Sequence, residues 1–370
     1  MNPFKYGKVV NGENYCPRPS IAAQFQKLVA SGQNIVVQGE RRIGKTSFVC
    51  ESVLTMPGAR LLYIDLFCVK TIAEFCRRAV VAVAELDKQE SFLRRAAKLI
   101  ASLRPMLALD RDTGAPTLTI DLKSANTIAS IEEVMDMLTE YGKDGNLCVI
   151  FDEFQDLLDI PEAETLLARL RAKIQFMGNT AVVFLGSVRN QMHAIFSSPQ
   201  SPFYKSAVEF SIGAIPESDF VPFLQARFSA GRRKAAAETI ARIIALADGI
   251  SGDVQELCEA VWLATEEEAA VDDNALQAGL ETVFSREMKT FYAVASKLTA
   301  TQMAVLRALA DDGRAKVYGR DFLEKAAVRN VGTVTRSLKR LTDDNLLFEY
   351  DGQWKFTNPF FREWLRRTRA

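Results

Sequence analysis

The sequence predicts an α/β core built on a parallel sheet, followed by an all-helical region and a C-terminal winged helix-turn-helix. Short, continuously apolar segments alternate with helical patterns over the first 215 residues, which is typical of a parallel sheet covered on both faces. Residues 217–290 show helical periodicity throughout, and from residue 296 three short helical patterns precede a hairpin pattern. We therefore predict three domains, over residues 1–215, 216–293 and 294–370.

Five apolar segments supply the predicted strands of the core, at residues 35–38, 61–66, 147–151, 181–185 and 208–212. The second and third are separated by an unusually long stretch that contains turn residues at 112–116 and an alternating pattern at 117–122. We predict a β-hairpin insertion near residues 106–122. It is either a contact surface for a protein partner or a simple decoration of the core.

A glycine-containing loop joins the first predicted strand to a helical pattern. It reads Gly39-Glu40-Arg41-Arg42-Ile43-Gly44-Lys45-Thr46-Ser47 and meets the spacing G-x-x-x-x-G-K-[ST]. In such a loop successive backbone N–H groups face a polyphosphate, the lysine holds the β- and γ-phosphates, and the threonine binds Mg²⁺. We predict that a nucleoside triphosphate and Mg²⁺ are bound by Gly39, Arg41, Arg42, Ile43, Gly44, Lys45, Thr46 and Ser47.

Two carboxylates follow the third predicted strand, in a pattern typical of a Walker B strand. Asp152 is placed to hold Mg²⁺, and Glu153 is placed to polarise a water molecule for attack on the γ-phosphate. A carboxylate beside the magnesium aspartate favours hydrolysis, so we predict an ATPase and not a kinase. Ser187, Arg189 and Asn190 follow the fourth strand and are candidate γ-phosphate sensors, with solvated loop residues as the alternative.

The composition argues against several other classes. A formal net charge of zero gives no global attraction to nucleic acid or to membranes. The six cysteines form no C-x-x-C pair, and the single histidine, His193, lies in a helical context where we expect it to pack. No apolar segment is long enough to span a membrane, so we expect a cytoplasmic protein without a membrane partner.

Taken together, these motifs resemble the archaeal-type ATPase family, which belongs to the STAND branch of AAA+-like P-loop ATPases. The segments that carry the resemblance are the phosphate loop with Arg41-Arg42, residues 62–66, residues 151–155, Gly186-Ser187 with Met192, and Ser201-Pro202-Phe203-Tyr204. The resemblance covers nearly the whole chain. It implies ATP as the nucleotide, a sheet of strand order 5-1-4-3-2, a helical lid and a C-terminal winged helix. It also implies that Tyr6 and Arg18 lie near the adenine.

Two positions of the family pattern, one after the Pro-Phe-Tyr motif and one in the lid, bear on the site. Many members carry a basic residue after the Pro-Phe-Tyr motif that acts on the nucleotide of a neighbouring subunit, and Lys205 stands at that place here. Lys205 is therefore a candidate for action in a nucleotide-dependent homo-oligomer. The lid motif reads Gly249-Ile250-Ser251 and lacks the proline of the family, which puts the lid's role in nucleotide sensing in question.

The C-terminal region is locally basic. Residues 296–370 contain 15 Lys and Arg against 9 Asp and Glu, a surplus of six positive charges. The third helical pattern, 331–341, has an apolar face and a polar face, and the polar face carries Arg336, Lys339 and Arg340. These cations could contact double-stranded DNA, although winged helices also bind proteins. We expect the aromatic residues of the tail, 360–367, to dock on the domain and its arginines to add to the basic patch.

The sequence thus predicts an ATP-hydrolysing switch whose nucleotide state controls oligomerisation or the engagement of DNA by the winged helix. The alternative is a regulatory scaffold that binds ATP, hydrolyses little of it, and uses the winged helix and the insertion to hold protein partners.

Overall fold

The computed structural model describes residues 2–86, 90–109, 116–123, 127–143, 145–187, 189–313, 316–350 and 352–368. Its contacts divide the chain into two compact units, one of residues 9–213 and one of residues 214 onward together with the first eight residues. We describe each unit by itself. None of the helices in the described ranges has the length and apolar character needed to cross a membrane.

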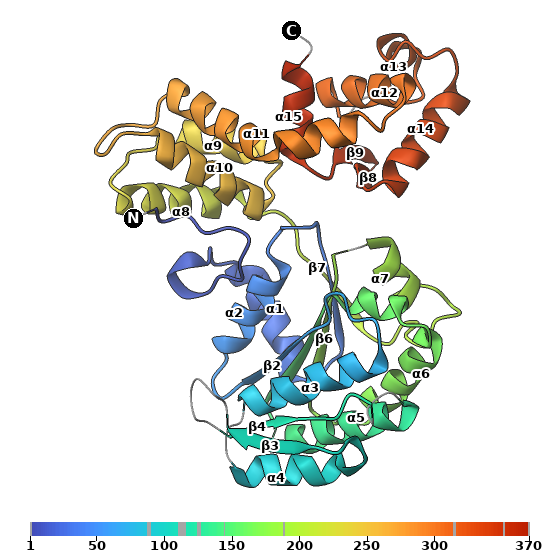
Figure 1. Cartoon of the computed structure of the whole chain (residues 1–370). Coiled ribbons are helices and arrows are strands. Elements are labelled where there is room, and N and C mark those ends of the chain that lie inside the picture. The colour runs from blue at the N-terminus through green and yellow to red at the C-terminus, as the bar shows by residue number, and fades with distance from the viewer. Residues whose placement is uncertain are drawn as a thin grey trace. The chain divides into compact units, whose positions relative to one another are not determined.

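A five-stranded parallel sheet forms the centre of the first unit (Figure 1). Its strands are β1 (Ile35–Gln38), β2 (Arg60–Asp65), β5 (Leu147–Asp152), β6 (Ala181–Leu185) and β7 (Val208–Ser211). They lie in the order β7-β1-β6-β5-β2, all parallel. Numbered among these five alone, the order is 5-1-4-3-2, and the predicted fold class is confirmed.

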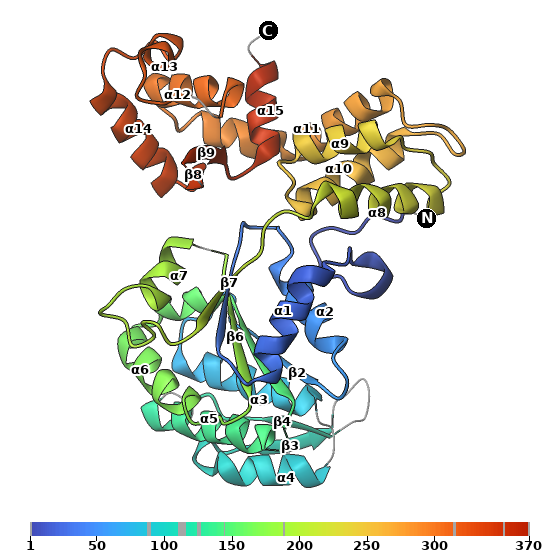
Figure 2. The same cartoon turned by 180° about the vertical axis from the view of Figure 1, so that it is seen from behind.

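Helices cover both faces of this sheet (Figures 1 and 2). Alternate strand residues point to opposite faces, so Val37 and Ile150 pack with α1 and α2, while Val36 and Phe151 pack on the other face. The central strands β5 and β6 are buried along their whole length, which explains their continuous apolarity. The helices of this unit are α1 (Pro19–Ala30), α2 (Lys45–Leu54), α3 (Ile72–Leu86), α4 (Glu90–Leu99), α5 (Ile128–Gly142), α6 (Ala163–Ile174) and α7 (Arg189–Phe196), with 3₁₀ helices at Gly12–Asn14, Ala101–Leu103 and Phe154–Asp159.

Two antiparallel strands lie within the range predicted for the insertion. They are β3 (Met106–Leu109) and β4 (Pro116–Thr119), with Leu107 opposite Leu118. Leu118 is buried in the core with residues of α3 and α4, whereas Met106 and Leu107 are exposed. Of the turn predicted at 112–116, residues 112–115 lie outside the described residues, and Pro116 begins β4.

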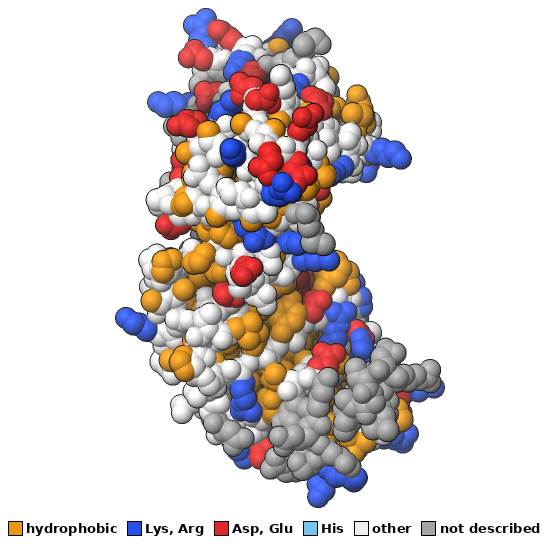
Figure 3. Space-filling model, turned by 90° about the vertical axis from the view of Figure 1, so that its left-hand side faces the viewer, with side chains coloured by type: hydrophobic (Ala, Val, Ile, Leu, Met, Phe, Trp, Pro, Cys, Tyr) orange, Lys and Arg blue, Asp and Glu red, His pale blue; other side chains and the backbone are white. Residues whose placement is uncertain are grey.

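The second unit begins with four helices, as the helical periodicity predicts: α8 (Glu217–Ala230), α9 (Ala237–Leu246), α10 (Ser251–Ala264) and α11 (Asp273–Ala295). The first residues of the chain pack here, where the ring of Phe4 lies 4.6 Å from that of Phe228. The acidic run after α10 is balanced locally, because Arg232 pairs with Glu267 and Glu268. On the face drawn in Figure 3, acidic and basic side chains are interspersed over these helices. Mixed charges of this kind are typical of a solvated surface.

The rest of the second unit has the elements of a winged helix-turn-helix: α12 (Ala300–Asp311), α13 (Arg320–Lys325), α14 (Val331–Asp343), β8 (Leu347–Tyr350), β9 (Gln353–Phe356) and α15 (Pro359–Arg367). Thr299 and Gln302 form a capping box at the start of α12. Strands β8 and β9 pair antiparallel as the wing. The aromatic residues of α15 dock as predicted, with the ring of Phe361 5.4 Å from that of Phe291 in α11.

Candidate functional site

The loop between β1 and α2 has the backbone conformation that a phosphate-binding loop requires. Gly44 is the N-cap of α2 with a φ of +91°, a left-handed conformation that favours glycine. A Cβ atom at Gly39 would lie 2.6 Å from the carbonyl oxygen of Ile212, so only glycine fits there. Because α2 begins at Lys45, its first amide groups have no carbonyl partner within the helix and face the loop. These features fit the polyphosphate of a nucleotide.

The side chains of the loop divide into buried and exposed groups. Lys45 is buried, and its Nζ donates to the carbonyl oxygens of Gly39 and Glu40 at 3.1 and 2.9 Å, so the ammonium lies over the loop. Ile43 and Ser47 are buried, whereas Arg41 and Arg42 are exposed. The Ser47 hydroxyl accepts a hydrogen bond from the Val10 amide at 3.0 Å. Ser47 therefore ties the N-terminal segment to α2.

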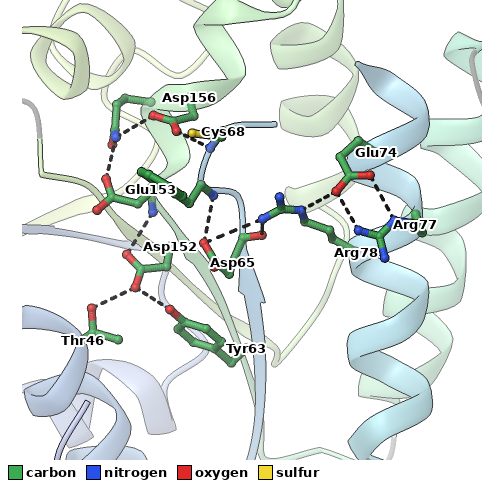
Figure 4. A network of polar contacts seen from close by, with 12 residues as sticks. Thr46, Tyr63, Asp65, Cys68, Glu74, Arg77, Arg78, Asp152, Glu153 and Asp156 are labelled. Atoms are coloured by element: carbon green, nitrogen blue, oxygen red, sulfur yellow. Dashed lines mark hydrogen bonds and ion pairs between the residues drawn. The ribbon is translucent and has the colours of Figure 1, made fainter. Parts of the chain in front are cut away.

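Asp152 and Thr46, which the sequence predicts as the Mg²⁺ ligands, are in contact (Figure 4). The Thr46 hydroxyl donates to Oδ2 of Asp152 at 2.8 Å. Burial raises the pKa of Asp152, although its hydrogen bonds act in the opposite direction. A hydroxyl and one carboxylate are the protein ligands that Mg²⁺ commonly takes beside phosphate oxygens, so this pair fits a Mg²⁺·nucleotide.

Tyr63 of β2 completes this group and is a residue that the motif analysis missed. Its hydroxyl donates to the same Oδ2 oxygen of Asp152 at 2.7 Å. Burial and the neighbouring carboxylate raise the pKa of Tyr63, which therefore stays a proton donor. The sequence held part of the signal for this contact, because the strand order that the family resemblance implies places β2 beside β5. The register of the two strands, which pairs Asp65 with Asp152, comes from the structure.

Glu153 and Ser187 come from neighbouring strands and meet at the same edge of the sheet. Oε2 of Glu153 accepts hydrogen bonds from the Ser187 hydroxyl at 2.8 Å and from the Ser187 amide at 3.3 Å. Glu153 itself has a φ of +51°, so the backbone turns sharply as β5 ends. Arg189 begins α7, and its side chain lies outside the described part of the structure.

The chain is similar to solved structures over nearly its whole length. The Walker-type ATPase of Pyrococcus abyssi superposes with a TM-score of 0.65 at 20% identity, covering 99% of this chain and 100% of that one. The ORC2 protein of Aeropyrum pernix, in its ADPNP–ADP complexes, gives a TM-score of 0.59 at 14% identity, covering 98% of this chain and 96% of that one. This chain has the fold of a Walker-type ATPase.

Further similarities agree with this ATPase fold. A family model described as a probable winged helix domain matches residues 289–367. The ADP form of the same ORC2 protein gives a TM-score of 0.52 at 13% identity, covering 97% of each chain. No curated protein sequence matches the chain. The resemblance to archaeal ATPases that the motifs predict is thus confirmed in the fold.

The two residues predicted near the adenine belong to different units of this ATPase fold. Arg18 is buried in the first unit, where its guanidinium donates to the carbonyl oxygens of Gly213 and Ile43 at 2.7 and 2.9 Å. Burial lowers the pKa of Arg18. Tyr6 belongs to the second unit, where its hydroxyl lies 3.2 Å from Arg286. Arg18 therefore contacts the phosphate loop directly, through Ile43.

Lys205, the candidate for action on a neighbouring subunit, is exposed at a turn after α7. Its φ is +51°, and its ammonium lies 5.3 Å from the centre of the Tyr204 ring. His193 lies on α7 as predicted, but its side chain is exposed, so the expectation that it packs is wrong.

The cations of the winged helix are distributed differently from the prediction. Those of α14 are exposed, namely Arg336, Lys339 and Arg340, and Arg340 also pairs with Asp344 at 3.0 Å. The tail arginines do not add to this patch. Arg362 pairs with Asp248 and Glu363, Arg366 with Glu363, and Arg367 with Glu281. Charge counting along the chain missed this because Asp248 and Glu281 lie far away in the sequence.

Proposed function

We propose that this chain binds Mg²⁺·ATP at its phosphate loop and hydrolyses it, and that the nucleotide state controls the engagement of DNA by the winged helix. The observation that carries the first part is the convergence of Thr46, Asp152, Glu153 and Ser187 at one edge of the sheet, beside the loop. The fold similarity to Walker-type and ORC2 structures supports it.

Each residue has a distinct role in this proposal. Lys45 and the loop amides hold the β- and γ-phosphates, and Thr46 and Asp152 hold Mg²⁺. Bound Mg²⁺ supplies charge neutralisation on the phosphate oxygens. Glu153 orients and accepts a proton from the attacking water, and Ser187 holds the Glu153 carboxylate in place.

The domain division belongs to the same proposal. Residues 1–215 hydrolyse ATP, residues 216–293 transmit the nucleotide state, and residues 294–370 engage the partner. Lys205 acts on the nucleotide of a neighbouring copy in a homo-oligomer. Sedimentation of wild type and Lys205→Ala with ATP or ADP tests this step. The proposal requires that ATP promotes association of the protein. It also requires that association speeds ATP turnover in wild type and not in Lys205→Ala.

Phosphate release tests the hydrolysis. We expect steady-state release from wild type, and a loss of at least about 100-fold in Glu153→Gln with ATP binding retained, because only the transition state is affected. Glu164→Gln, on the exposed side of α6, is the matched control and should match wild type.

DNA binding is measured separately at low salt. The triple variant Arg336→Ala, Lys339→Ala, Arg340→Ala should bind duplex DNA at least about tenfold more weakly than wild type, because phosphate contacts dominate the affinity. A triple variant of the paired tail arginines, Arg362, Arg366 and Arg367, would test folding and not this surface. Equal binding by wild type and the α14 variant excludes the proposed DNA role.

A second candidate function is a scaffold that binds ATP and holds a protein partner through the insertion. The exposed apolar side chains of Met106 and Leu107 on β3 favour it. Equal, near-background phosphate release from wild type and Glu153→Gln would support the scaffold over the ATPase.

A further inference from the structure

One amide side chain, Gln155, lies between two carboxylates at the edge of the candidate site. It belongs to the 3₁₀ helix Phe154–Asp159 and is 2% exposed. Its Nε2 donates to Oε2 of Glu153 at 2.6 Å and to Oδ1 of Asp156 at 2.9 Å. The nitrogen of the Gln155 amide, and not its oxygen, is assigned to this position, because an amide oxygen there would face two carboxylate oxygens.

The surroundings of Gln155 leave it little freedom. Its Oε1 accepts no hydrogen bond within the described part of the chain, so its polar contacts are made through Nε2. A Cβ atom at Gly186 would lie 2.4 Å from that Oε1, which shows how closely the backbone after β6 approaches it. Gln155 therefore has a single orientation, packed against the backbone that follows β6.

The contacts of Glu153 converge on one of its two oxygens. Oε2 accepts from Gln155 and from both the hydroxyl and the amide of Ser187. A carboxylate oxygen has about two lone-pair sites, so these donors saturate Oε2. Oε1 is consequently the oxygen left to meet a water molecule, and its direction is set by the donors that hold Oε2.

Asp156 connects Gln155 to the segment that follows β2, and Figure 4 shows the Asp156 carboxylate beside Cys68 of that segment. Its second oxygen, Oδ2, accepts from the amide of Cys68 at 2.7 Å, and the Leu66 amide donates to the carbonyl of Asp152 at 2.9 Å. Within this segment Leu66 and Val69 are buried, whereas Phe67 and Cys68 are exposed. The segment 66–69 thus has exposed side chains only at Phe67 and Cys68, and its backbone is hydrogen-bonded to both ends of the 152–156 turn.

We propose that Gln155 is a positioning residue that sets the orientation of the Glu153 carboxylate and couples it, through Asp156, to the segment 66–69. This inference rests on the proposed hydrolysis for its effect on rate. The two hydrogens of one rigid amide bind the two carboxylates, so a displacement of the segment 66–69 moves Asp156, Gln155 and Glu153 together.

The variant Gln155→Met tests the rate effect, because methionine fills a similar volume and donates no hydrogen bond. We expect kcat for phosphate release to fall at least about tenfold, with KM for ATP within about twofold of wild type. Gln175→Met, an exposed glutamine at the end of α6, is the matched control and should keep wild-type kcat. An unchanged or increased kcat in Gln155→Met overturns the positioning role.

Hydrogen exchange of the nucleotide-free protein tests the coupling without any turnover. In Gln155→Met the amides of Cys68 and Ser187 should exchange at least about fivefold faster than in wild type, while those of α6 stay unchanged. Unchanged exchange at both amides overturns the coupling. Asp156→Asn is a second variant, since one acceptor oxygen is lost there and the buried packing around Gln155 is kept.

A failure of the proposed hydrolysis can be distinguished from a failure of the inference about Gln155. If wild type and Glu153→Gln release phosphate equally slowly, hydrolysis is wrong, and the exchange of Cys68 and Ser187 still decides whether Gln155 holds Glu153 and the segment 66–69 together.

Discussion

Thr46 and Tyr63 donate hydrogen bonds to one and the same atom, Oδ2 of Asp152, at 2.8 and 2.7 Å. They reach it from different elements, α2 and β2. Both hydrogen bonds favour the ionised carboxylate and oppose burial, which raises the pKa of Asp152. The protonation state of Asp152 therefore depends on burial, which raises its pKa, and on these hydrogen bonds, which lower it. Removing one hydroxyl changes that pKa.

Removing the Tyr63 hydroxyl should move the pH dependence of activity. A hydrogen bond of about 0.5–1.5 kcal/mol corresponds to about half to one pKa unit, so Tyr63→Phe should raise the pKa of Asp152 by that amount. The acid limb of the pH–rate profile for phosphate release then shifts to higher pH. Tyr292→Phe, an exposed tyrosine of α11, is the control. An acid limb at the wild-type position would contradict this role of Tyr63.

Neutralising Asp152 should stabilise the nucleotide-free protein at pH 7. Its folded-state pKa lies above the unfolded value, so its contribution to stability is lost as the pH rises from the unfolded through the folded pKa. In the variant Asp152→Asn the side-chain amide carries no charge to bury, and its oxygen can still accept from the two hydroxyls. Its NH2 group then replaces Oδ1, which accepts from the Glu153 amide at 2.9 Å, so the loss of that hydrogen bond reduces the gain from removing the charge. We expect this variant to gain about 1 kcal/mol, or about 2–4 °C in Tm.

The pH dependence of that gain is the check. Below about pH 4 the aspartate is protonated in both states, and the Tm difference between wild type and Asp152→Asn should shrink. A variant that melts below wild type at pH 7 would show that the carboxylate is stabilised in the fold.

Arg362 should matter for stability far more than other arginines of the winged helix. Its side chain is 16% exposed and pairs with Asp248, which is 20% exposed, and with Glu363, which is 9% exposed. Arg362→Met leaves these carboxylates without their partner, and we expect a loss of about 2–4 kcal/mol in urea unfolding. Arg320→Met breaks an exposed pair with Glu324 and should cost less than about 0.5 kcal/mol. Similar losses in the two variants would contradict this ranking.

A methyl group at Gly39 should disrupt the phosphate loop. The added Cβ would lie 2.6 Å from a backbone oxygen that cannot turn away, so we expect Gly39→Ala to lose about 2 kcal/mol of stability and most of its ATP affinity. Gly213→Ala is the matched control, since a Cβ there meets nothing within 4 Å. Thermal unfolding and titration with a fluorescent ATP analogue measure both effects, and wild-type behaviour of Gly39→Ala would refute the steric argument.

Features encoded by local patterns were predictable from the sequence. The strands of the core follow from continuous apolarity, and the loop, Asp152 and Glu153 follow from spacing relative to those strands. The order of the strands is a long-range property and came from the family resemblance. Tyr63 and Gln155 were missed as site residues because neither belongs to a sequence motif. Each is placed in the site only by a hydrogen bond to a carboxylate, Tyr63 to Asp152 and Gln155 to Glu153.

The pairing of the α15 arginines has a consequence for any polyanion that meets the winged helix. Arg362, Arg366 and Arg367 are already paired with protein carboxylates, so they are less available to neutralise DNA phosphates and release the cations condensed on the duplex. A duplex bound on α14 by Arg336 and Lys339, with Arg340 shared with Asp344, would therefore lose affinity with salt at a logarithmic slope of about −2 to −3, about half or less of what the surplus of six charges suggests. The ion pairs of the C-terminal helix thus leave the domain with fewer cations available to DNA than its composition implies.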